Sequence, residues 1–379
     1  WSFVFKFNSV EEPGAPKPPG MTGVARSECS AYLRRQMKAT LKMDSRCTEL
    51  KLPEGMSASM VRLGNGNLLT VKDNAVFTSG DDGKSWSERG PVYTGKRPGI
   101  PGSGLLLQTR DDWTILLYLD SSSLIWSWDD ETGQAAPNAR LDVWSVRSPD
   151  GGETWMDRQR IMEGYCGALI TAVQMGRGNI VVPVQILLRD PDRHATMSYM
   201  SEDDGKTWTH SNILDLGGHG HHDGAMEATL AELKNGTLLM LLRTNLDYFW
   251  ASYSMDQGRL WHILQKSAID ASSSPGYLLR LASGRLCLVW NRLNPLDGNA
   301  PVRRSGHYSR AEASWQRGEL AIAFSDDEAG SWSDPQVVVT SSEPPFPCYP
   351  VVFEHSPGLL WITAGDMKFS LREGDFVVA

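Results

Sequence analysis

An eight-residue motif occurs five times along this chain and constrains its fold more than any other feature. The motif reads Ser-x-Asp-x-Gly-x-(Thr/Ser)-Trp, and its copies occupy residues 79–86, 148–155, 201–208, 254–261 and 325–332. The fourth copy has Leu260 at the hydroxyl position, and the fifth has Ala329 in place of the glycine. A motif that returns along the chain is typical of a repeat architecture, in which similar units pack side by side.

The residue types of the motif predict a tight turn. An Asp side chain accepts hydrogen bonds from nearby backbone N–H groups, and Gly adopts positive φ without strain. A short β run precedes each copy, and upstream of it lie hairpins with Gly-containing turns, such as Asn65-Gly66 and Asn235-Gly236. Each repeat is therefore predicted to be a four-stranded antiparallel sheet, with the motif as a hairpin turn.

Counting these repeats predicts an all-β, six-bladed β-propeller. Five blades carry the motif, and a sixth without it spans residues 349–363. We expect strands within residues 23–50 to complete that blade and close the ring, which would remove exposed sheet edges. Residues 1–22 are rich in Pro and Gly and are predicted to form an extended segment, and residues 23–379 are predicted to form a single propeller domain. The alternatives are seven blades, or five blades with an appended module.

Composition limits the partners. The net charge of −8 argues against a nucleic-acid partner, so an anion site must be a local group of arginines. The sequence contains no 18-residue apolar run, which predicts no membrane-spanning helix. Five scattered cysteines without a CxxC pair are the pattern neither of a zinc site nor of a dense disulfide framework. We expect no metal and no cofactor. A secreted or periplasmic location is favoured, and the oligomeric state stays open.

The repeated motif resembles the Asp box of the sialidase (neuraminidase) superfamily, and the similarity extends over residues 50–375. Glu227 opens a predicted strand of the fourth blade, a Lys-Asn-Gly turn follows, and Arg243 ends the next strand. This order and spacing are similar to the sialidase pattern. Arg317 begins the strand that leads into the fifth motif, and Tyr349 opens the last blade, again as in sialidases.

The resemblance implies a retaining exo-glycosidase that removes terminal sialic acid, or a related acidic sugar, from glycans. Tyr349 would be the nucleophile and Glu227 the group that takes its proton, as in sialidases that depart from the usual pair of carboxylates. Arg243 and Arg317 would bind the anionic substrate through charge-assisted hydrogen bonds.

Two parts of the family pattern are missing. Sialidases begin their first blade with Arg-Ile-Pro, whereas residues 55–60 here read Gly-Met-Ser-Ala-Ser-Met, so Arg97 is a candidate replacement for the absent arginine. The loop that holds the acid/base Asp in sialidases is shortened to residues 72–74, which makes Asp73 a candidate for that role. Other candidates lie in a Trp-rich insertion: Asp120, Asp129 and Asp130.

A His-rich loop at residues 217–224 directly precedes Glu227 and offers His221, His222 and Asp223 for substrate contact or proton transfer. His194, with Tyr199 close in sequence, is a candidate substrate-binding residue or a His/Tyr pair like that of propeller polysaccharide lyases. The alternative functions are therefore another exo-glycosidase, a uronate lyase, or a glycan-binding propeller without activity.

Overall fold

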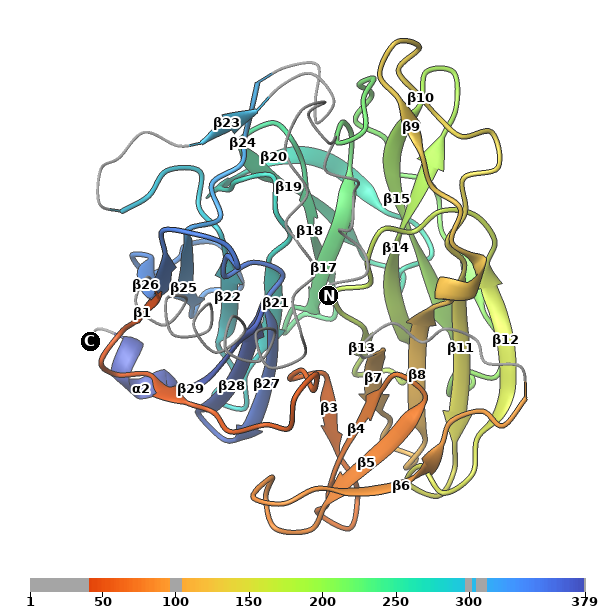
Figure 1. Ribbon diagram of the computed structural model, residues 1–379, viewed down its shortest axis with the longest axis vertical. Helices are drawn as coiled ribbons and strands as arrows, with labels where there is room; N and C mark the ends of the chain where they lie inside the picture. The colour runs from red at the N-terminus through yellow and green to blue at the C-terminus, as the bar shows by residue number, and fades with distance from the viewer. Residues whose placement is uncertain (1–40, 96–103, 297–301, 305–311, 378–379) are drawn as a thin grey trace, which may run out of the picture.

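The computed structural model describes residues 41–95, 104–296, 302–304 and 312–377. The described residues form six antiparallel sheets of four or five strands, arranged as the blades of a β-propeller (Figure 1), and two short two-stranded arms. The predicted all-β, six-bladed fold is confirmed, and the alternatives with five or seven blades are wrong. The expected extended segment at residues 1–22 lies outside the described residues.

Blades one to five each contain four strands that follow one another along the chain apart from the arms, and blade six contains three such strands and one N-terminal strand. Blade one contains β3 (Met60–Arg62), β4 (Leu68–Lys72), β5 (Ala75–Ser79) and β6 (Ser87–Pro91). Blade two contains β7 (Leu105–Gln108), β8 (Thr114–Leu119), β11 (Val143–Ser148) and β12 (Met156–Met162). Blade three contains β13 (Val173–Gln174), β14 (Ile180–Leu188), β15 (Arg193–Ser201) and β16 (Thr209–His210).

Blades four to six continue the pattern and take up two N-terminal strands. Blade four contains β17 (Met226–Glu232), β18 (Leu238–Arg243), β19 (Tyr248–Ser254) and β20 (His262–Asp270). Blade five contains β21 (Tyr277–Arg280), β22 (Leu286–Trp290), β25 (Glu319–Ser325), β26 (Gln336–Ser341) and the N-terminal β1 (Leu41–Met43). Blade six contains β27 (Val351–Ser356), β28 (Leu359–Ala364), β29 (Met367–Arg372) and the N-terminal β2 (Thr48–Glu49).

The first strand of each blade lies nearest the axis, because the first strands of neighbouring blades contact one another, as β17 does with β13 and β21. Two arms leave this frame. One, in blade two, contains the 3₁₀ turn η1 (Ser121–Ser123), β9 (Trp128–Asp129) and β10 (Gln134–Ala135). The other, in blade five, contains β23 (Arg303–Arg304) and β24 (Ala313–Ser314). Both arms rise on the same side of the ring, at the top of Figure 1.

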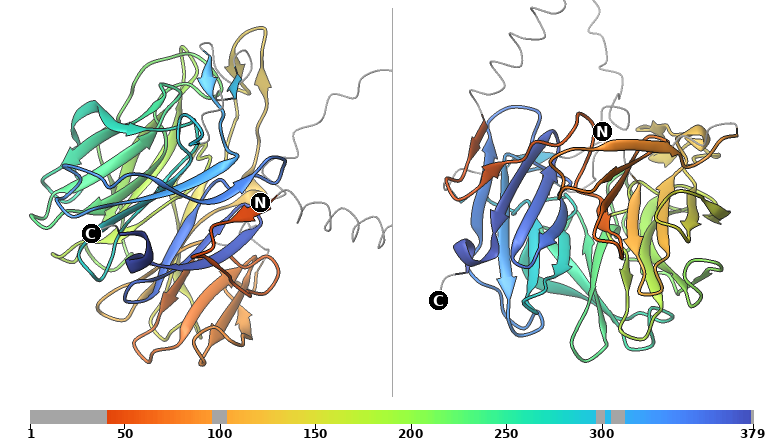
Figure 2. Two further views of the ribbon diagram at one scale, coloured as in Figure 1. Left: turned by 90° about the vertical axis from the view of Figure 1, so that its left-hand side faces the viewer. Right: turned by 90° about the horizontal axis from the view of Figure 1, so that it is seen from below.

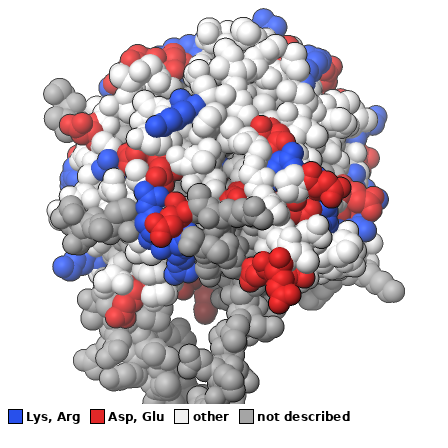
Figure 3. Space-filling model, turned by 90° about the horizontal axis from the view of Figure 1, so that it is seen from above, with Lys and Arg blue, Asp and Glu red and all other residues white. Residues whose placement is uncertain are grey.

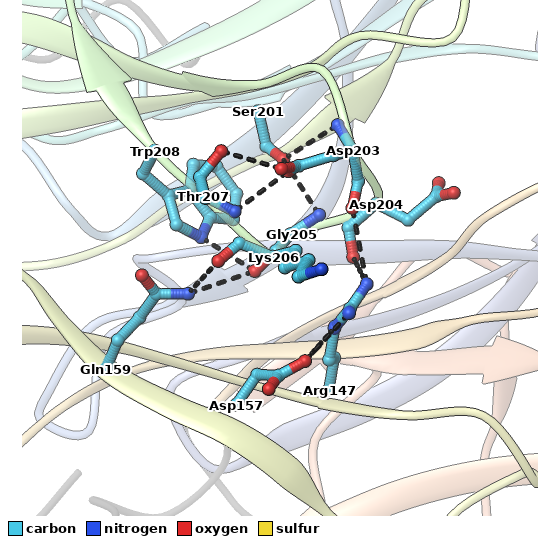
Figure 4. Close-up of polar contacts among 10 residues, drawn as sticks. All are labelled: Arg147, Asp157, Gln159, Ser201, Asp203, Asp204, Gly205, Lys206, Thr207 and Trp208. Carbon is cyan, nitrogen blue, oxygen red and sulfur yellow. Dashed lines mark hydrogen bonds and ion pairs between the residues drawn. The ribbon is translucent and has the colours of Figure 1, made fainter.

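The predicted Asp-box turns connect the third and fourth strands of blades one to five. In blade three, Ser201 Oγ donates to Asp203 Oδ1 at 2.8 Å and accepts from Gly205 N at 2.8 Å, while Thr207 Oγ1 donates to Asp203 Oδ2 at 2.6 Å (Figure 4). Arg147 of blade two donates to the backbone carbonyls of Asp203 and Asp204. The box therefore closes its own hairpin and also joins two blades.

The glycine of the box is required by space as well as by its backbone. Gly83 has φ +84°, and a Cβ added there would lie 2.3 Å from the Trp361 ring of blade six. Gly205 has φ +79°, and its Cβ would lie 2.9 Å from Ile115 of blade two. Ala329, which replaces this glycine in the fifth box, has φ +68° and packs against the apolar cluster shared with blade four.

Apolar side chains fill the spaces between blades. Six clusters of buried residues occur in the described part of the chain, and each lies between two neighbouring blades. The cluster of Met60, Leu68 and Trp361 joins blade one to blade six, so the ring is closed by packing.

Hydrogen bonding from the N-terminal strands also closes the ring. β2 pairs with β29 and completes blade six, as predicted for a strand within residues 23–50. β1 pairs with β26 and adds a fifth strand to blade five, which the sequence did not predict. Figure 2 shows both strands, in red, beside the blue C-terminal blades. No helix of the described residues is both long and apolar enough to cross a bilayer.

Candidate active site

The site lies at the end of the axis opposite the Asp boxes. In an antiparallel blade, the start of the first strand and the end of the second strand meet at this end, as the pairing of Met226 with Arg243 shows. Glu227 lies at the start of β17, Arg243 ends β18, and Tyr349 lies two residues before β27. Residues far apart in sequence therefore converge where the inner strands begin.

Tyr349, Glu227 and Arg243 form one hydrogen-bonded group. The Tyr349 hydroxyl donates to Glu227 Oε1 at 2.9 Å and accepts from Arg243 Nη1 at 3.0 Å. The same Arg243 nitrogen donates to Glu227 Oε2 at 2.5 Å. Arg243 therefore donates to both members of the pair, and Glu227 accepts the hydrogen bond of the Tyr349 phenol.

Burial strengthens these contacts. Tyr349, Glu227 and Arg243 are 6%, 7% and 2% exposed. Burial, together with the charge of Glu227, raises the pKa of Tyr349, so the phenol is neutral at ordinary pH. Burial acts against the charge of Arg243, but the adjacent Glu227 carboxylate and Tyr349 outweigh it, and the pKa of Arg243 is raised.

Arg317 and Trp315 form the neighbouring wall. Arg317 is also buried, and its Nη2 donates to the carbonyl of Ser273 at 2.9 Å. The Ser273 hydroxyl accepts from Nε and Nη2 of Arg243, each at 3.3 Å, so one serine contacts both arginines. The Trp315 ring centroid lies 4.5 Å from the guanidinium carbon of Arg317 and 5.7 Å from that of Arg243. These are cation–π contacts at a desolvated site.

The Gln185 side chain connects His194 to the backbone of Glu227. The Gln185 amide nitrogen lies 2.9 Å from His194 Nδ1, and the Gln185 carbonyl accepts from the backbone N–H of Glu227 at 3.3 Å. Since the amide nitrogen can only donate, His194 Nδ1 accepts and Nε2 carries the proton. Burial lowers the pKa of His194 to about 4, so the ring is neutral above that pH.

The His-rich loop and the blade-two arm share aromatic contacts. The His221 ring lies 5.1 Å from Trp126, 5.4 Å from Trp128 and 4.1 Å from His222, between ring centroids. The edge of His222 meets Trp315 at 5.0 Å. Burial, followed by the nearby charge of His221 and Arg243, lowers the pKa of His222 well below its ordinary value. Rings thus line the site from blade two to blade five.

Asp223 ends the same loop. Its Oδ1 accepts from Asn245 at 2.6 Å, and its Oδ2 accepts from the backbone N–H of His219 at 3.2 Å. Asp223 is 5% exposed.

Figure 3 views the end of the molecule from which the arms rise, and Lys and Arg are interspersed there with Asp and Glu. Positive charge at the site is therefore local, from its arginines.

Comparison with known proteins decides the family. The family model for the BNR repeat-like domain matches residues 73–362. This chain is a BNR-repeat propeller of the sialidase superfamily. The BNR-repeat propeller is 30% identical to a sialidase of Paraclostridium sordellii over 213 residues, 50% of each protein. It is 26% identical to a sialidase of Clostridium perfringens over 256 residues, 56% of this chain and 62% of that protein. The chain therefore matches only part of the length of these relatives.

Solved structures share the architecture. A Dyadobacter fermentans protein of unknown function superposes with a TM-score of 0.59 at 15% identity, over 87% of this chain and 98% of that one. A Hadza microbial sialidase gives 0.54 at 16% identity, over 84% and 65%. A mutant of the NanB sialidase from Streptococcus pneumoniae gives 0.54 at 12% identity, over 90% and 72%. At these identities the likeness is one of fold.

The structure of this BNR-repeat propeller brings some predicted residues together and separates others. Glu227, Tyr349, Arg243 and Arg317 meet, and His222, His194 and Asp223 lie around them. Asp73 is an exposed turn residue between β4 and β5, and no hydrogen bond or ion pair joins it to another described residue. Arg97 lies outside the described residues.

The proposed pair of His194 and Tyr199 is wrong. Both residues lie on β15, five positions apart, so their side chains point to opposite faces of the strand. Tyr199 packs in the cluster between blades two and three, with its ring 6.0 Å from His210 on the outer strand. This geometry removes the His/Tyr pair that the uronate-lyase alternative would use.

Several residues of the site were not predicted. Gln185, Ser273 and Trp315 hold or border the acidic and basic groups, but each belongs to a run of ordinary strand or loop residues in the sequence. Trp315 had one usable signal, its position two residues before Arg317. Among the described residues there is no group of three His, Cys, Asp or Glu side chains placed to hold a metal ion.

Proposed function

We propose that this propeller is a retaining exo-glycosidase of the sialidase type, acting on terminal sialic acid or a related acidic sugar of a glycan. The observation that carries the proposal is the buried contact of 2.9 Å between the Tyr349 hydroxyl and Glu227, with Arg243 bonded to both. A carboxylate placed to accept the proton of a hydroxyl is the arrangement of an activated nucleophile.

In the first step, Tyr349 Oη attacks the anomeric carbon as its proton passes to Glu227 Oε1. The bond from that carbon to the leaving oxygen breaks, and an acid protonates the leaving oxygen. The product is a sugar bound covalently to Tyr349. A neutral phenol suits this step, because an anionic nucleophile would be repelled by the carboxylate that an acidic sugar carries beside the anomeric carbon.

In the second step, water attacks the same carbon, and the residue that acted as the acid now takes a proton from the water. The bond to Tyr349 breaks, and the phenolate recovers its proton from Glu227. Two displacements at one carbon retain its configuration. Arg317 and Arg243 would bind the substrate carboxylate and hold the ring in position for both steps.

We assign the acid/base role to Asp223 rather than to Asp73. Asp223 ends the loop that leads into β17, only four residues before Glu227, and it is buried and held by Asn245. Asp73 is exposed, and no hydrogen bond or ion pair joins it to the described site residues. His222, neutral and close to Arg243, would then contact the substrate.

The proposal is tested by the release of a fluorescent alcohol from an α-sialoside, with uronide and rhamnoside analogues run in parallel. Glu227→Gln and Tyr349→Phe are each expected to lower kcat about 10³-fold or more, since both remove groups that act in the transition state. Tyr199→Phe is the matched control, because it removes a phenol hydroxyl elsewhere in the propeller and should leave kcat unchanged. Release from no sialoside, or full activity in either site variant, would contradict the proposal.

The acid/base assignment has its own test. Asp223→Asn should slow cleavage of a sialyl-lactose, whose leaving group needs a proton, at least tenfold more than cleavage of a sialoside with an acidic phenol as leaving group. Asp73→Asn should affect neither substrate. Equal losses on both substrates in the Asp223 variant would refute the acid/base role.

A further inference from the structure

The blade-five arm carries an arginine toward the site that no part of the family pattern supplied. On β23, Arg303 forms an ion pair with Asp247 of blade four, with contacts of 2.7 and 2.8 Å. Successive side chains of a strand point to opposite sides, so Arg304 lies on the other side of β23. Its guanidinium carbon lies 5.9 Å from the Trp315 ring centroid.

Backbone hydrogen bonds fix this arm to the segment that holds the site arginines. The Trp315 N–H donates to the carbonyl of Val302 at 2.6 Å, and the Ser273 N–H donates to the carbonyl of Ser314 at 2.9 Å. Ser273 is the residue that contacts both Arg243 and Arg317. The base of the arm and the two buried arginines are therefore parts of one connected structure.

Three guanidinium carbons lie within 6 Å of the Trp315 ring centroid: those of Arg317, Arg243 and Arg304. Arg243 is bonded to Glu227, so their charges offset each other. Arg317 then provides one positive charge that a substrate could use. A carboxylate has about four acceptor positions, and one guanidinium meets a carboxylate with at most two parallel N–H bonds, so acceptor positions remain for a second cation. Arg304 is exposed and long enough to approach a bound anion.

We propose that Arg304 binds the anionic group of the substrate together with Arg317, beside the Trp315 ring. Residues 56–60, which lead into the first strand of blade one, carry no charge, and the blade-five arm offers Arg304 as a second positive charge. This inference rests on the proposed function, because it requires an acidic sugar at Tyr349 and Glu227. It makes Arg304 a specificity residue that favours an acidic sugar over a neutral one.

The test is calorimetric binding of 2-deoxy-2,3-didehydro-N-acetylneuraminic acid, an unsaturated analogue that keeps the carboxylate, at two salt concentrations. Arg304→Ala should raise Kd about tenfold at low salt, and Arg304→Lys should restore part of the affinity. The loss should shrink at high salt, because Arg304 is exposed and its charge is screened. Arg259→Ala is the control: it removes an exposed arginine of the fourth Asp box, at the opposite end of blade four, and should bind like the wild type.

Each outcome separates this inference from the function on which it rests. If the wild type cleaves sialosides and Arg304→Ala keeps its affinity, Arg304 has no role in binding and the inference fails alone. A loss that Lys does not restore, or that is the same at both salt concentrations, also overturns it, because the effect would then be structural. If the wild type neither binds the analogue nor cleaves a sialoside, the inference and the proposed function fail together.

Discussion

Tyr349 combines a reactive position with a strained backbone. Its φ is +54°, although it precedes Pro350, and a residue before proline favours extended conformations. The strain orients the phenol toward the axis, where Glu227 and Arg243 hold it from two sides. Strained residues of this kind concentrate at functional sites, because the surrounding packing must enforce them.

Gln185 positions the carboxylate by holding the backbone from which it extends. Gln185→Leu should lower kcat several-fold with little change in KM and reduce the free energy of unfolding by about 1–3 kcal/mol, because it leaves His194 Nδ1 and the Glu227 N–H unpaired. Steady-state kinetics and urea unfolding check both effects. An unchanged free energy of unfolding in the Leu variant would contradict this reason.

His194 should make stability depend on pH. Its pKa is about 4 when folded, below the ordinary value of 6.5, so its contribution is complete above pH 6.5 and is lost as the pH falls toward 4. Between pH 7.5 and 5, the free energy of unfolding should fall by about 2 kcal/mol from this residue. Urea unfolding of wild type and His194→Gln at both pH values measures this change in the free energy of unfolding. An equal pH dependence in the two proteins would refute the role of His194.

At the scale of the element, the Asp box connects a turn to its neighbouring blade. Gly83→Ala should reduce the free energy of unfolding by about 2–4 kcal/mol, from positive φ and from the clash with Trp361. Gly66→Ala is the matched control in the same blade, because Gly66 has φ +88° but nothing within 4 Å of an added Cβ. Gly66→Ala should reduce the free energy of unfolding by only about 1 kcal/mol. Equal losses in the two variants would show that packing between blades plays no part.

The arms are held in place rather than free. Arg189 of blade three donates to the carbonyls of Ala135 and Ala136, and Asp192 accepts from the Ala135 N–H at 2.8 Å. The blade-five arm is held in turn through Arg303 and Asp247. Both arms therefore act as fixed walls beside the site, and the aromatic side chains of the blade-two arm keep their position against His221.

At the scale of the whole molecule, ring closure depends on two short N-terminal strands. Removal of residues 1–50 should lower the apparent Tm by more than 5 °C and promote aggregation, because β29 and β26 become exposed edges. Removal of residues 1–45 deletes β1 but keeps β2, and it should have a smaller effect. Calorimetry and light scattering provide the measurements, and an equal Tm for the two truncations would contradict the role of β2 in closing the ring.

Most of the fold could be predicted from the sequence because the box is a local signal. Its Ser, Asp and Gly act within eight residues, so the turn, the strands on either side and the number of blades follow from the repeats. β1 was not predicted, because three residues that pair with β26 across nearly the whole chain leave no local pattern.

The convergence of candidate site residues could be predicted only where these residues occupy fixed positions on the blades. Glu227, Arg243, Arg317 and Tyr349 lie at strand ends that the repeat defines. Gln185 and Arg304 depend on contacts between blades and on an inserted arm, which spacing does not reveal. The pairing of His194 with Tyr199 was wrong because sequence proximity was given more weight than the alternation of side chains along a strand.

The most direct test of the central claim is the identity of the nucleophile. A 2,3-difluorosialic acid with a good leaving group should transfer its sugar to the protein, because the fluorine at carbon 3 slows the second displacement. Intact mass should rise by one sugar, and peptide mapping should place the sugar on Tyr349, with no labelling of Tyr349→Phe. A sugar on another residue, or rapid turnover of sialosides without labelling in the wild type, would contradict the account.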